Sequence, residues 1–140
     1  MKVVLDANIF ISFLLTKGKT IFLIIKFWQE KRFVLLVSET MLEEVEQVCQ
    51  RLIEKDFIVE DEAKELLWRL RCDARLIDVC SKTSVSPDKK DNRYLVCAKD
   101  GKADYLITGD KKHLLFLGEF AGVKIISPGE FVKILKNSLV

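Results

Sequence analysis

Four acidic residues stand where a carboxylate could take part in chemistry: Asp6, Glu44, Asp91 and Asp110. Asp6 directly follows Lys2–Leu5, an aliphatic run that suits a strand buried on both faces of a parallel sheet. Asp110 closes a second β-rich run, Tyr105–Thr108. In doubly wound α/β proteins the ligand crevice lies outside the carboxyl ends of the strands. The sequence therefore predicts that Asp6 and Asp110 lie at the same edge of a sheet.

Glu44 belongs to a helix that is expected to begin after Ser38, a good N-cap, with Glu39 in its first turn. At about 100° per residue, Glu43 points well away from the apolar stripe of this helix, which indicates a solvated charge. Glu44 and Glu46 fall at the two borders of the stripe, where a carboxylate can lean toward a cleft beside the core. Helix geometry thus favours Glu44 over Glu43 but does not exclude Glu46.

Each acid also has a simple structural explanation. Asp6 could cap the helix that follows it, and Asp91 could cap a helix from about Asn92, although Asp88 competes for that role. Asp110 could cap a short helix over Lys111–Leu117. Taken one at a time, capping and solvation are the better explanations of these carboxylates.

Taken together, the acids indicate a metal site. Carboxylates that converge on one sheet edge repel one another and raise each other's pKa unless a cation lies between them. Oxygen ligands without cysteine or histidine favour Mg²⁺ or Mn²⁺. Such ions polarise a phosphodiester, ionise an attacking water and stabilise the leaving oxygen.

Strands alternate with helices along the chain, which predicts a three-layer α/β/α fold with a central, mainly parallel, five-stranded sheet. We expect the 140 residues to form a single domain, 1–140, because the sequence shows no linker that would divide it. The expected strands are Lys2–Leu5, Phe33–Val37, Leu76–Val79, Tyr105–Thr108 and Val123–Ile126. The expected helices are Ala7–Leu15, Thr20–Lys31, one after Ser38, Glu60–Arg71, one from about Asn92 that Gly101 ends, Lys111–Leu117 and one after Ser127-Pro128.

Composition excludes several classes of function. The net charge of +2 argues against a protein that binds nucleic acid by bulk charge alone, so a polyanion would need a local patch or metal ions. Cys49, Cys72, Cys80 and Cys97 are widely spaced and His113 is the one histidine, which disfavours a zinc site. Apolar runs such as Ile21–Ile25 are too short to span a membrane. We expect a cytoplasmic protein with reduced, mostly buried thiols.

Four segments carry a resemblance to a known family: VLDAN from Val4, SETMLEEVEQV from Ser38, DKKDNRYL from Asp88 and ADYLITGDKKHLL from Ala103. They resemble the successive motifs of a PIN domain, over essentially the whole chain. The last segment is the most specific. The resemblance is strongest to prokaryotic single-domain PIN proteins that act as toxins of toxin–antitoxin pairs (VapC-like).

The resemblance implies a Mg²⁺- or Mn²⁺-dependent endoribonuclease that hydrolyses RNA phosphodiester bonds and leaves a 5′-phosphate and a 3′-hydroxyl. Its metal-binding and catalytic acids fall on Asp6, Glu44, Asp91 and Asp110. Asn8 and Thr108 match the polar residues that accompany the first and fourth acids.

The resemblance also implies partners: a single-stranded or structured RNA substrate, a small antitoxin protein of a type II pair, and a second copy of the chain in a homodimer. Phe13, Phe27 and Trp28 would suit an interface, although core packing explains them equally well. Basic residues that could meet RNA phosphates flank the third and fourth acids, with solvated surface as the simpler explanation: Lys89, Lys90, Arg93, Lys111 and Lys112. His113 is a further candidate, as a general base.

The main alternative is a non-catalytic regulatory module, such as a phospho-receiver, because doubly wound folds serve many functions. A receiver would need a phosphorylatable Asp after a central strand. The third expected strand ends in Val79-Cys80-Ser81, which supplies no such residue.

Overall fold

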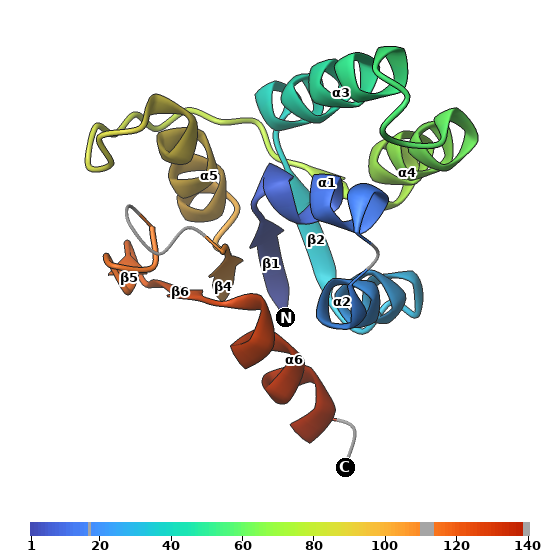
Figure 1. The fold of residues 1–140 in the computed structure, drawn as a ribbon. Helices are drawn as coiled ribbons and strands as arrows, with labels where there is room; N and C mark the ends of the chain where they lie inside the picture. Colours follow the sequence, from blue (N-terminus) through green and yellow to red (C-terminus); the bar gives the residue numbers. More distant parts are fainter. Residues whose placement is uncertain (17, 110–113, 139–140) are drawn as a thin grey trace.

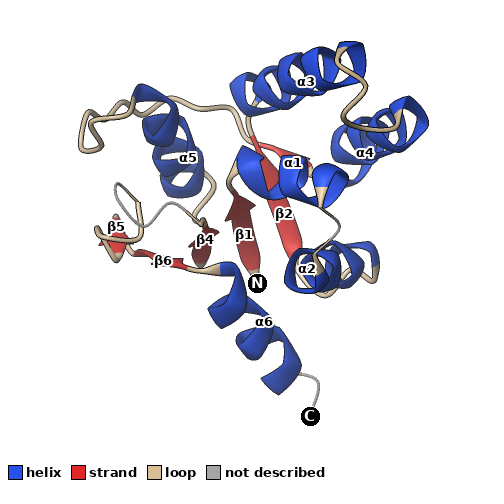
Figure 2. Cartoon of the chain, in the orientation of Figure 1, coloured by secondary structure: helices blue, strands red, loops and turns tan. Residues whose placement is uncertain are grey.

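A computed structural model of the 140-residue chain describes residues 1–16, 18–109 and 114–138. Figures 1 and 2 show helices and strands alternating along most of the chain. The strands are β1 (Lys2–Leu5), β2 (Val34–Val37), β3 (Arg75–Leu76), β4 (Tyr105–Ile107), β5 (Glu119–Phe120) and β6 (Val123–Ile126). The helices are α1 (Ala7–Leu15), α2 (Lys19–Gln29), α3 (Glu39–Glu54), α4 (Glu60–Asp73), α5 (Lys89–Asp100) and α6 (Pro128–Asn137).

The strands form one sheet in the order β3-β2-β1-β4-β6-β5. Every neighbouring pair is parallel except β5 and β6. β1 lies between β2 and β4, so the strand order reverses around it, and this is where a crevice opens at the carboxyl ends of the strands.

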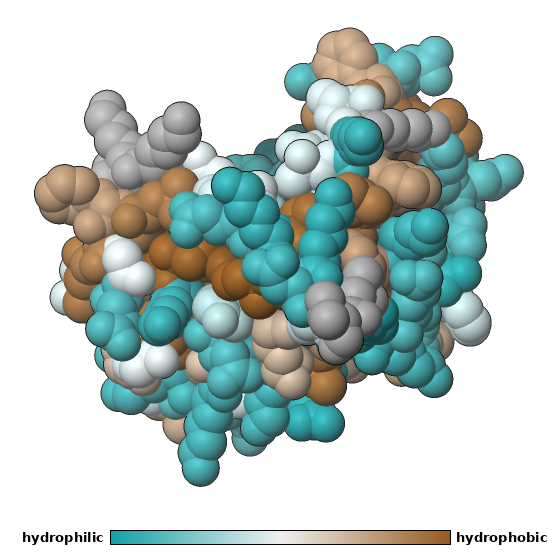
Figure 3. All heavy atoms as spheres, turned by 90° about the horizontal axis from the view of Figure 1, so that it is seen from below, coloured by the Kyte–Doolittle hydropathy of each residue, from teal (hydrophilic) through white to brown (hydrophobic). Residues whose placement is uncertain are grey.

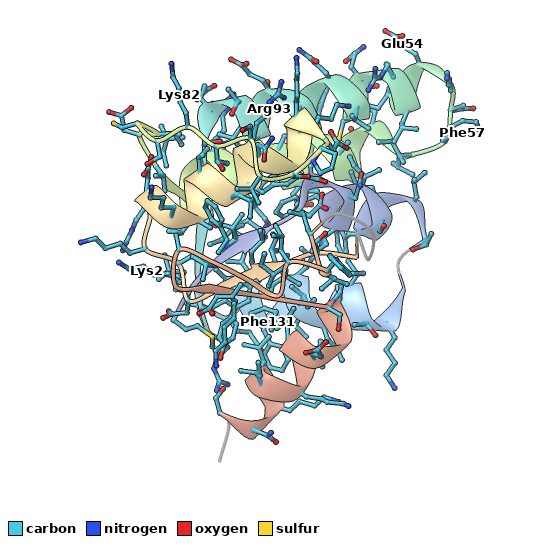
Figure 4. The ribbon with its side chains drawn as sticks, turned by 90° about the vertical axis from the view of Figure 1, so that its left-hand side faces the viewer. Lys2, Glu54, Phe57, Lys82, Arg93 and Phe131 are labelled. Carbon is cyan, nitrogen blue, oxygen red and sulfur yellow. The ribbon has the colours of Figure 1, made fainter. Side chains whose placement is uncertain are left out.

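The sheet is covered on both faces, which confirms the predicted three-layer α/β/α fold. α5 packs on β1, β2 and β4, while α2 and α6 lie side by side (Figure 1). On α6, Phe131 points toward the sheet, where its ring centroid lies 5.2 Å from that of Phe33 and 6.2 Å from that of Tyr105 (Figure 4).

The aromatic residues of α2 belong mostly to the core. Phe27 and Trp28 are buried, and Phe13 of α1 is partly buried against the same core. Core packing therefore explains these three side chains. Seen from below, hydrophilic side chains cover the right-hand side and the lower edge, and an apolar band extends from the left-hand side to the middle (Figure 3).

The prediction of five strands was wrong by one: Val123–Ile126 was predicted correctly and is β6, whereas β5, its partner in a hairpin, was missed. Ala121 and Gly122 link the two strands with positive φ angles of 52° and 83°, the backbone of a type I′ turn. An alanine at such a position gives no turn signal in the sequence. The expected helix over Lys111–Leu117 was also wrong where the structure describes it, because residues 114–117 form turns.

The third strand lies earlier than predicted and is shorter. β3 covers Arg75–Leu76, and its ladder ends where the Ile77 amide donates to the Val37 carbonyl at 2.8 Å. The amides of Cys80 and Ser81 then donate to Oδ2 of Asp100 at 2.7 and 2.8 Å, and the Ser81 hydroxyl donates to Oδ1 at 2.5 Å. These hydrogen bonds hold the pKa of the Asp100 carboxyl below its usual value. β3 stops early because Leu76 pairs with Val37, the last residue of β2, so no strand that the structure describes lies beside the residues that follow.

Gly101 ends α5 as predicted, and a glycine is needed there because a side chain would collide with neighbouring residues. Its φ is −81°, which any residue can adopt. A Cβ at this position would lie 2.7 Å from Cδ1 of Leu36 and 3.1 Å from Cγ1 of Ile77. The turn after α5 therefore passes too close to the sheet for a side chain.

All four thiols are free. Cys49 and Cys97 are buried, whereas Cys72 and Cys80 are exposed, so the prediction that most are buried was wrong for half of them. Within the part of the chain that the structure describes, no single helix is long and apolar enough to cross a membrane. α1 and α2 reach that length only together, across a bend of 113°.

Candidate functional site

A cavity of about 590 Å³ opens where β1 and β4 end, between α1, α3 and α5. We call it the acidic cavity, because four carboxylate residues line it. Its lining consists of Asp6, Ala7, Asn8, Ile11, Glu44, Val48, Asp88, Lys90, Asp91, Tyr94 and Gly109. Three of the four predicted acids, Asp6, Glu44 and Asp91, thus meet in one place although they are far apart in sequence.

Asp6 lies between β1 and α1 and is 3% exposed. Its Oδ1 accepts from the Asn8 amide at 2.9 Å, which caps α1, so the capping explanation of Asp6 is confirmed. Its Oδ2 accepts from the buried Thr108 hydroxyl at 2.9 Å. The Asp6 amide donates to the Ile107 carbonyl at 3.0 Å, which ties the end of β1 to that of β4. Capping and a position in the cavity are therefore compatible for Asp6.

Glu44 reaches the cavity from α3, whose N-cap is Ser38. Its carboxylate accepts from the hydroxyl of Tyr94 on α5, at 2.6 Å for Oε2 and 3.1 Å for Oε1. Glu46 instead accepts from the Arg71 guanidinium at 2.7 Å, across the contact between α3 and α4. Glu43 is exposed, as the helix geometry predicted. Between the two border residues, the structure brings Glu44 to the other acids and directs Glu46 to a salt bridge.

Asp91 lies in the first turn of α5 and is 5% exposed. The predicted start of this helix was three residues late, since α5 begins at Lys89 and its N-cap is Asp88, which accepts from the Lys90 amide at 2.9 Å. Asp91 is therefore inside the helix and not its cap. The Ser86 hydroxyl lies 3.4 Å from Oδ2 of Asp91.

Asn92 closes the loop before α5. Its side chain accepts from the Ser86 amide at 2.9 Å and donates to the Ser86 carbonyl at 3.0 Å. This pair of hydrogen bonds fixes buried Ser86, and with it the surroundings of Asp91. Ser86, Asn92 and Tyr94 were not among the predicted site residues. Spacing could have indicated Tyr94, because it lies three residues after Asp91 on the same helix and so near the same face. Ser86 and Asn92 carry no such signal.

The remaining predicted residues fall into two groups. Asn8 is exposed and lines the cavity. Lys90 also lines the cavity, and Lys89 and Arg93 are exposed on the same helix, with Arg93 visible on α5 in Figure 4. The predictions for Asp110, Lys111, Lys112 and His113 lie outside the described residues.

The donors that the cavity offers to a metal are carboxylate oxygens. Among the described residues, no three His, Cys, Asp or Glu side chains lie close enough together to hold a metal ion by themselves. Mg²⁺ demands less, because it keeps several waters and is usually bound by one or two carboxylates together with substrate phosphates. The donor chemistry of the acidic cavity therefore fits a hydrated Mg²⁺ or Mn²⁺ and does not fit zinc.

Comparison with known proteins shows which family the chain matches and which solved structure has a similar fold. The family model described as PIN domain matches residues 2–112. No curated protein sequence matches the chain. Among solved structures, VapBC2 from Rickettsia felis, bound to a DNA fragment from its promoter, aligns with a TM-score of 0.62 at 12% sequence identity. The alignment covers 91% of this chain and 98% of that chain. At this identity the likeness concerns the fold alone.

Proposed function

Since this chain belongs to the PIN domain family, we propose that it is a Mg²⁺- or Mn²⁺-dependent endoribonuclease that hydrolyses RNA phosphodiester bonds. One observation carries the proposal: Asp6, Glu44 and Asp91 line one cavity at the switch point of the sheet. Two of them are more than nine-tenths buried, which is costly for a carboxylate unless hydrogen bonds or a cation compensate. Buried carboxylates that line a cavity at this edge of the sheet support a functional site, in addition to the capping role of Asp6.

Asp6, Glu44, Asp91 and Asp110 would hold the metal, directly or through water. When bound, a divalent cation supplies Lewis-acid activation of water and of the scissile phosphate. Thr108 orients the Asp6 carboxylate through its hydroxyl, and Ser86 does the same for Asp91. Lys90, at the cavity wall, would meet an RNA phosphate, with Lys89 and Arg93 extending the basic surface along α5. The products would be a 5′-phosphate and a 3′-hydroxyl.

We further propose that the enzyme is the toxin of a type II toxin–antitoxin pair, working in the cytoplasm and assembling as a homodimer. The support is the match to the PIN family and the likeness in fold to VapBC2. A small antitoxin protein would be its partner. Copurification with the product of a neighbouring small gene, and inhibition of RNA cleavage by that product, would test this part.

The nuclease itself is tested by incubating labelled single-stranded RNA with the protein in Mn²⁺, Mg²⁺ or EDTA. We expect cleavage that needs the metal. Asp6→Asn should reduce it by more than the ~10- to 100-fold typical of residues that merely support a metal ligand. Asp73→Asn is a matched control, because Asp73 is an exposed aspartate at the C-terminal end of α4, outside the acidic cavity. Equal cleavage by Asp6→Asn and the wild type would contradict the proposal.

A further inference from the structure

Tyr94 is the one tyrosine of the acidic cavity, and its side chain is 3% exposed. It projects from the second turn of α5, three residues after Asp91. Its hydroxyl lies 2.6 Å from Oε2 of Glu44, a short hydrogen bond of the kind that forms with a charged acceptor. This bond joins α5, which carries Asp91, to α3, which carries Glu44.

The phenol is a donor in this bond. A phenol ordinarily has a pKa of about 10 and is protonated at neutral pH, whereas a carboxylate has no proton to donate, so the hydroxyl of Tyr94 donates and Glu44 accepts. A phenol has a single proton to give, so the shorter contact engages Oε2 and leaves Oε1 as the freer oxygen of Glu44.

Among the residues that the structure describes, Glu44 has no hydrogen-bond partner other than Tyr94. It is half-buried on a helix border and has a long, rotamer-rich side chain, whose ordering costs up to about 2 kcal/mol. Asp6 is held by Thr108 and by the Asn8 amide. For Glu44, the Tyr94 hydroxyl supplies the corresponding restraint. Without it, a half-exposed glutamate would spread over several rotamers, many of them turned toward solvent.

We propose that Tyr94 is a positioning residue that holds Glu44 in the acidic cavity and so raises its affinity for a divalent cation. The inference rests on the proposed function, because it assigns Glu44 to the metal site. Partners of this kind commonly change metal affinity by ~10- to 100-fold when removed. Tyr94 acts through Glu44 and does not itself touch the reacting atoms.

The test is the affinity of the purified protein for Mn²⁺, measured by titration calorimetry or electron paramagnetic resonance without RNA. Tyr94→Phe removes the hydroxyl and keeps the buried ring, so the core stays filled. Tyr105→Phe is the matched control, because Tyr105 is the second of two tyrosines and lies on β4, against Phe131. Circular dichroism and thermal unfolding of both variants report whether each is folded.

We expect Tyr94→Phe to weaken Mn²⁺ binding by about 10-fold, and Tyr105→Phe to leave it unchanged. In a Glu44→Gln background, adding Tyr94→Phe should weaken binding no further, because both changes remove the same interaction. A Tyr94→Phe protein that binds Mn²⁺ like the wild type overturns the role of Tyr94 and leaves the nuclease proposal intact. The role of Tyr94 is likewise overturned if Tyr94→Phe weakens Mn²⁺ binding in the Glu44→Gln background as much as it does in the wild type. A wild-type protein that binds no Mn²⁺ overturns both.

Discussion

The two ends of the sheet carry cavities of similar volume that differ in how deeply their charged side chains are buried. The acidic cavity, of about 590 Å³, lies at the carboxyl ends of β1 and β4. A second cavity, of about 490 Å³, lies at the amino ends of β2 and β3, and we call it the amino-end cavity. It is lined by Trp28, Gln29, Lys31, Phe33, Val34, Arg69, Cys72, Asp73, Ala74 and Arg75.

The difference lies in where the charged groups stand. At the amino end, Lys31, Asp73 and Arg75 are exposed, and Arg69 pairs with Glu65 one turn earlier on α4 at 3.3 Å. Exposed charges of this kind cost and contribute little. In the acidic cavity, Asp6 and Asp91 are buried, and each has a hydroxyl group directed at it. Cavity volume does not separate the two ends, whereas the burial of bonded carboxylates does.

The largest effect on the acidic cavity is expected from a substitution at Thr108, which donates to the buried Asp6 carboxylate. Thr108→Val keeps the shape of this fully buried side chain and removes its donor to Oδ2 of Asp6. A buried acceptor that loses its partner costs about 1–3 kcal/mol, so urea denaturation should give a free energy of unfolding lower by that amount. Mn²⁺ affinity should fall by ~10-fold or more, because Asp6 loses its orientation.

The matched change at the other end is Arg75→Gln. Arg75 is exposed, so its replacement should alter the free energy of unfolding by less than about 0.5 kcal/mol and leave Mn²⁺ affinity unchanged. If Arg75→Gln weakened Mn²⁺ binding as much as Thr108→Val did, the functional difference between the two ends would be lost.

A smaller loss of stability is expected from a substitution at Asn92, which does not line the acidic cavity but holds the loop that contains Ser86. Asn92→Ala deletes both hydrogen bonds to the Ser86 backbone, at a cost of about 1–2 kcal/mol in the free energy of unfolding. The Ser86 amide should exchange its hydrogen faster, which mass spectrometry of the peptide around Ser86 can measure. Asn137→Ala, at the exposed end of α6, is the control and should change neither quantity. Unchanged exchange at Ser86 would show that Asn92 does not hold this loop.

The order of strands and helices was predictable because it depends on local pattern. Short, mainly apolar runs predicted β1 and β2, and the periodic stripe of α3 correctly separated Glu43 from Glu44. The same reasoning placed Asp6 at the carboxyl edge of the sheet, where the acidic cavity opens. These features follow from residues that are neighbours in sequence.

The features that sequence reasoning missed depend on contacts between distant residues. The strand after α4 stops at Leu76 because its partner β2 ends at Val37, and the segment that follows is held by Asp100, which accepts from the amides of Cys80 and Ser81 across 20 and 19 positions. The bond from Tyr94 to Glu44 spans fifty positions, and no local pattern announces it. The choice between Glu44 and Glu46 was also open in the sequence, because it depends on Arg71 from the neighbouring helix.

The mildest contrast between the two regions concerns their thiols. Cys72 lines the amino-end cavity and is exposed, whereas Cys97 is buried on α5, three residues after Tyr94. Burial, with a smaller contribution from Asp100, raises the pKa of Cys97 to about 12 from a usual value of 9.0. At pH 8 a thiol reagent should therefore modify Cys72 and the exposed Cys80 quickly, and Cys97 only on unfolding, as mass spectrometry of the labelled peptides would show.

The same pKa shift gives a dependence of stability on pH. Unfolding releases a thiol that ionises at its ordinary pKa, so the stabilisation is fully present below about pH 9 and is lost as the pH rises toward the folded pKa of about 12. Between pH 9 and 10 the free energy of unfolding should fall by up to about 1.4 kcal/mol through this thiol. The control is Cys97→Ala, in which that part of the slope disappears. A variant with the same alkaline slope as the wild type would contradict the assignment to Cys97.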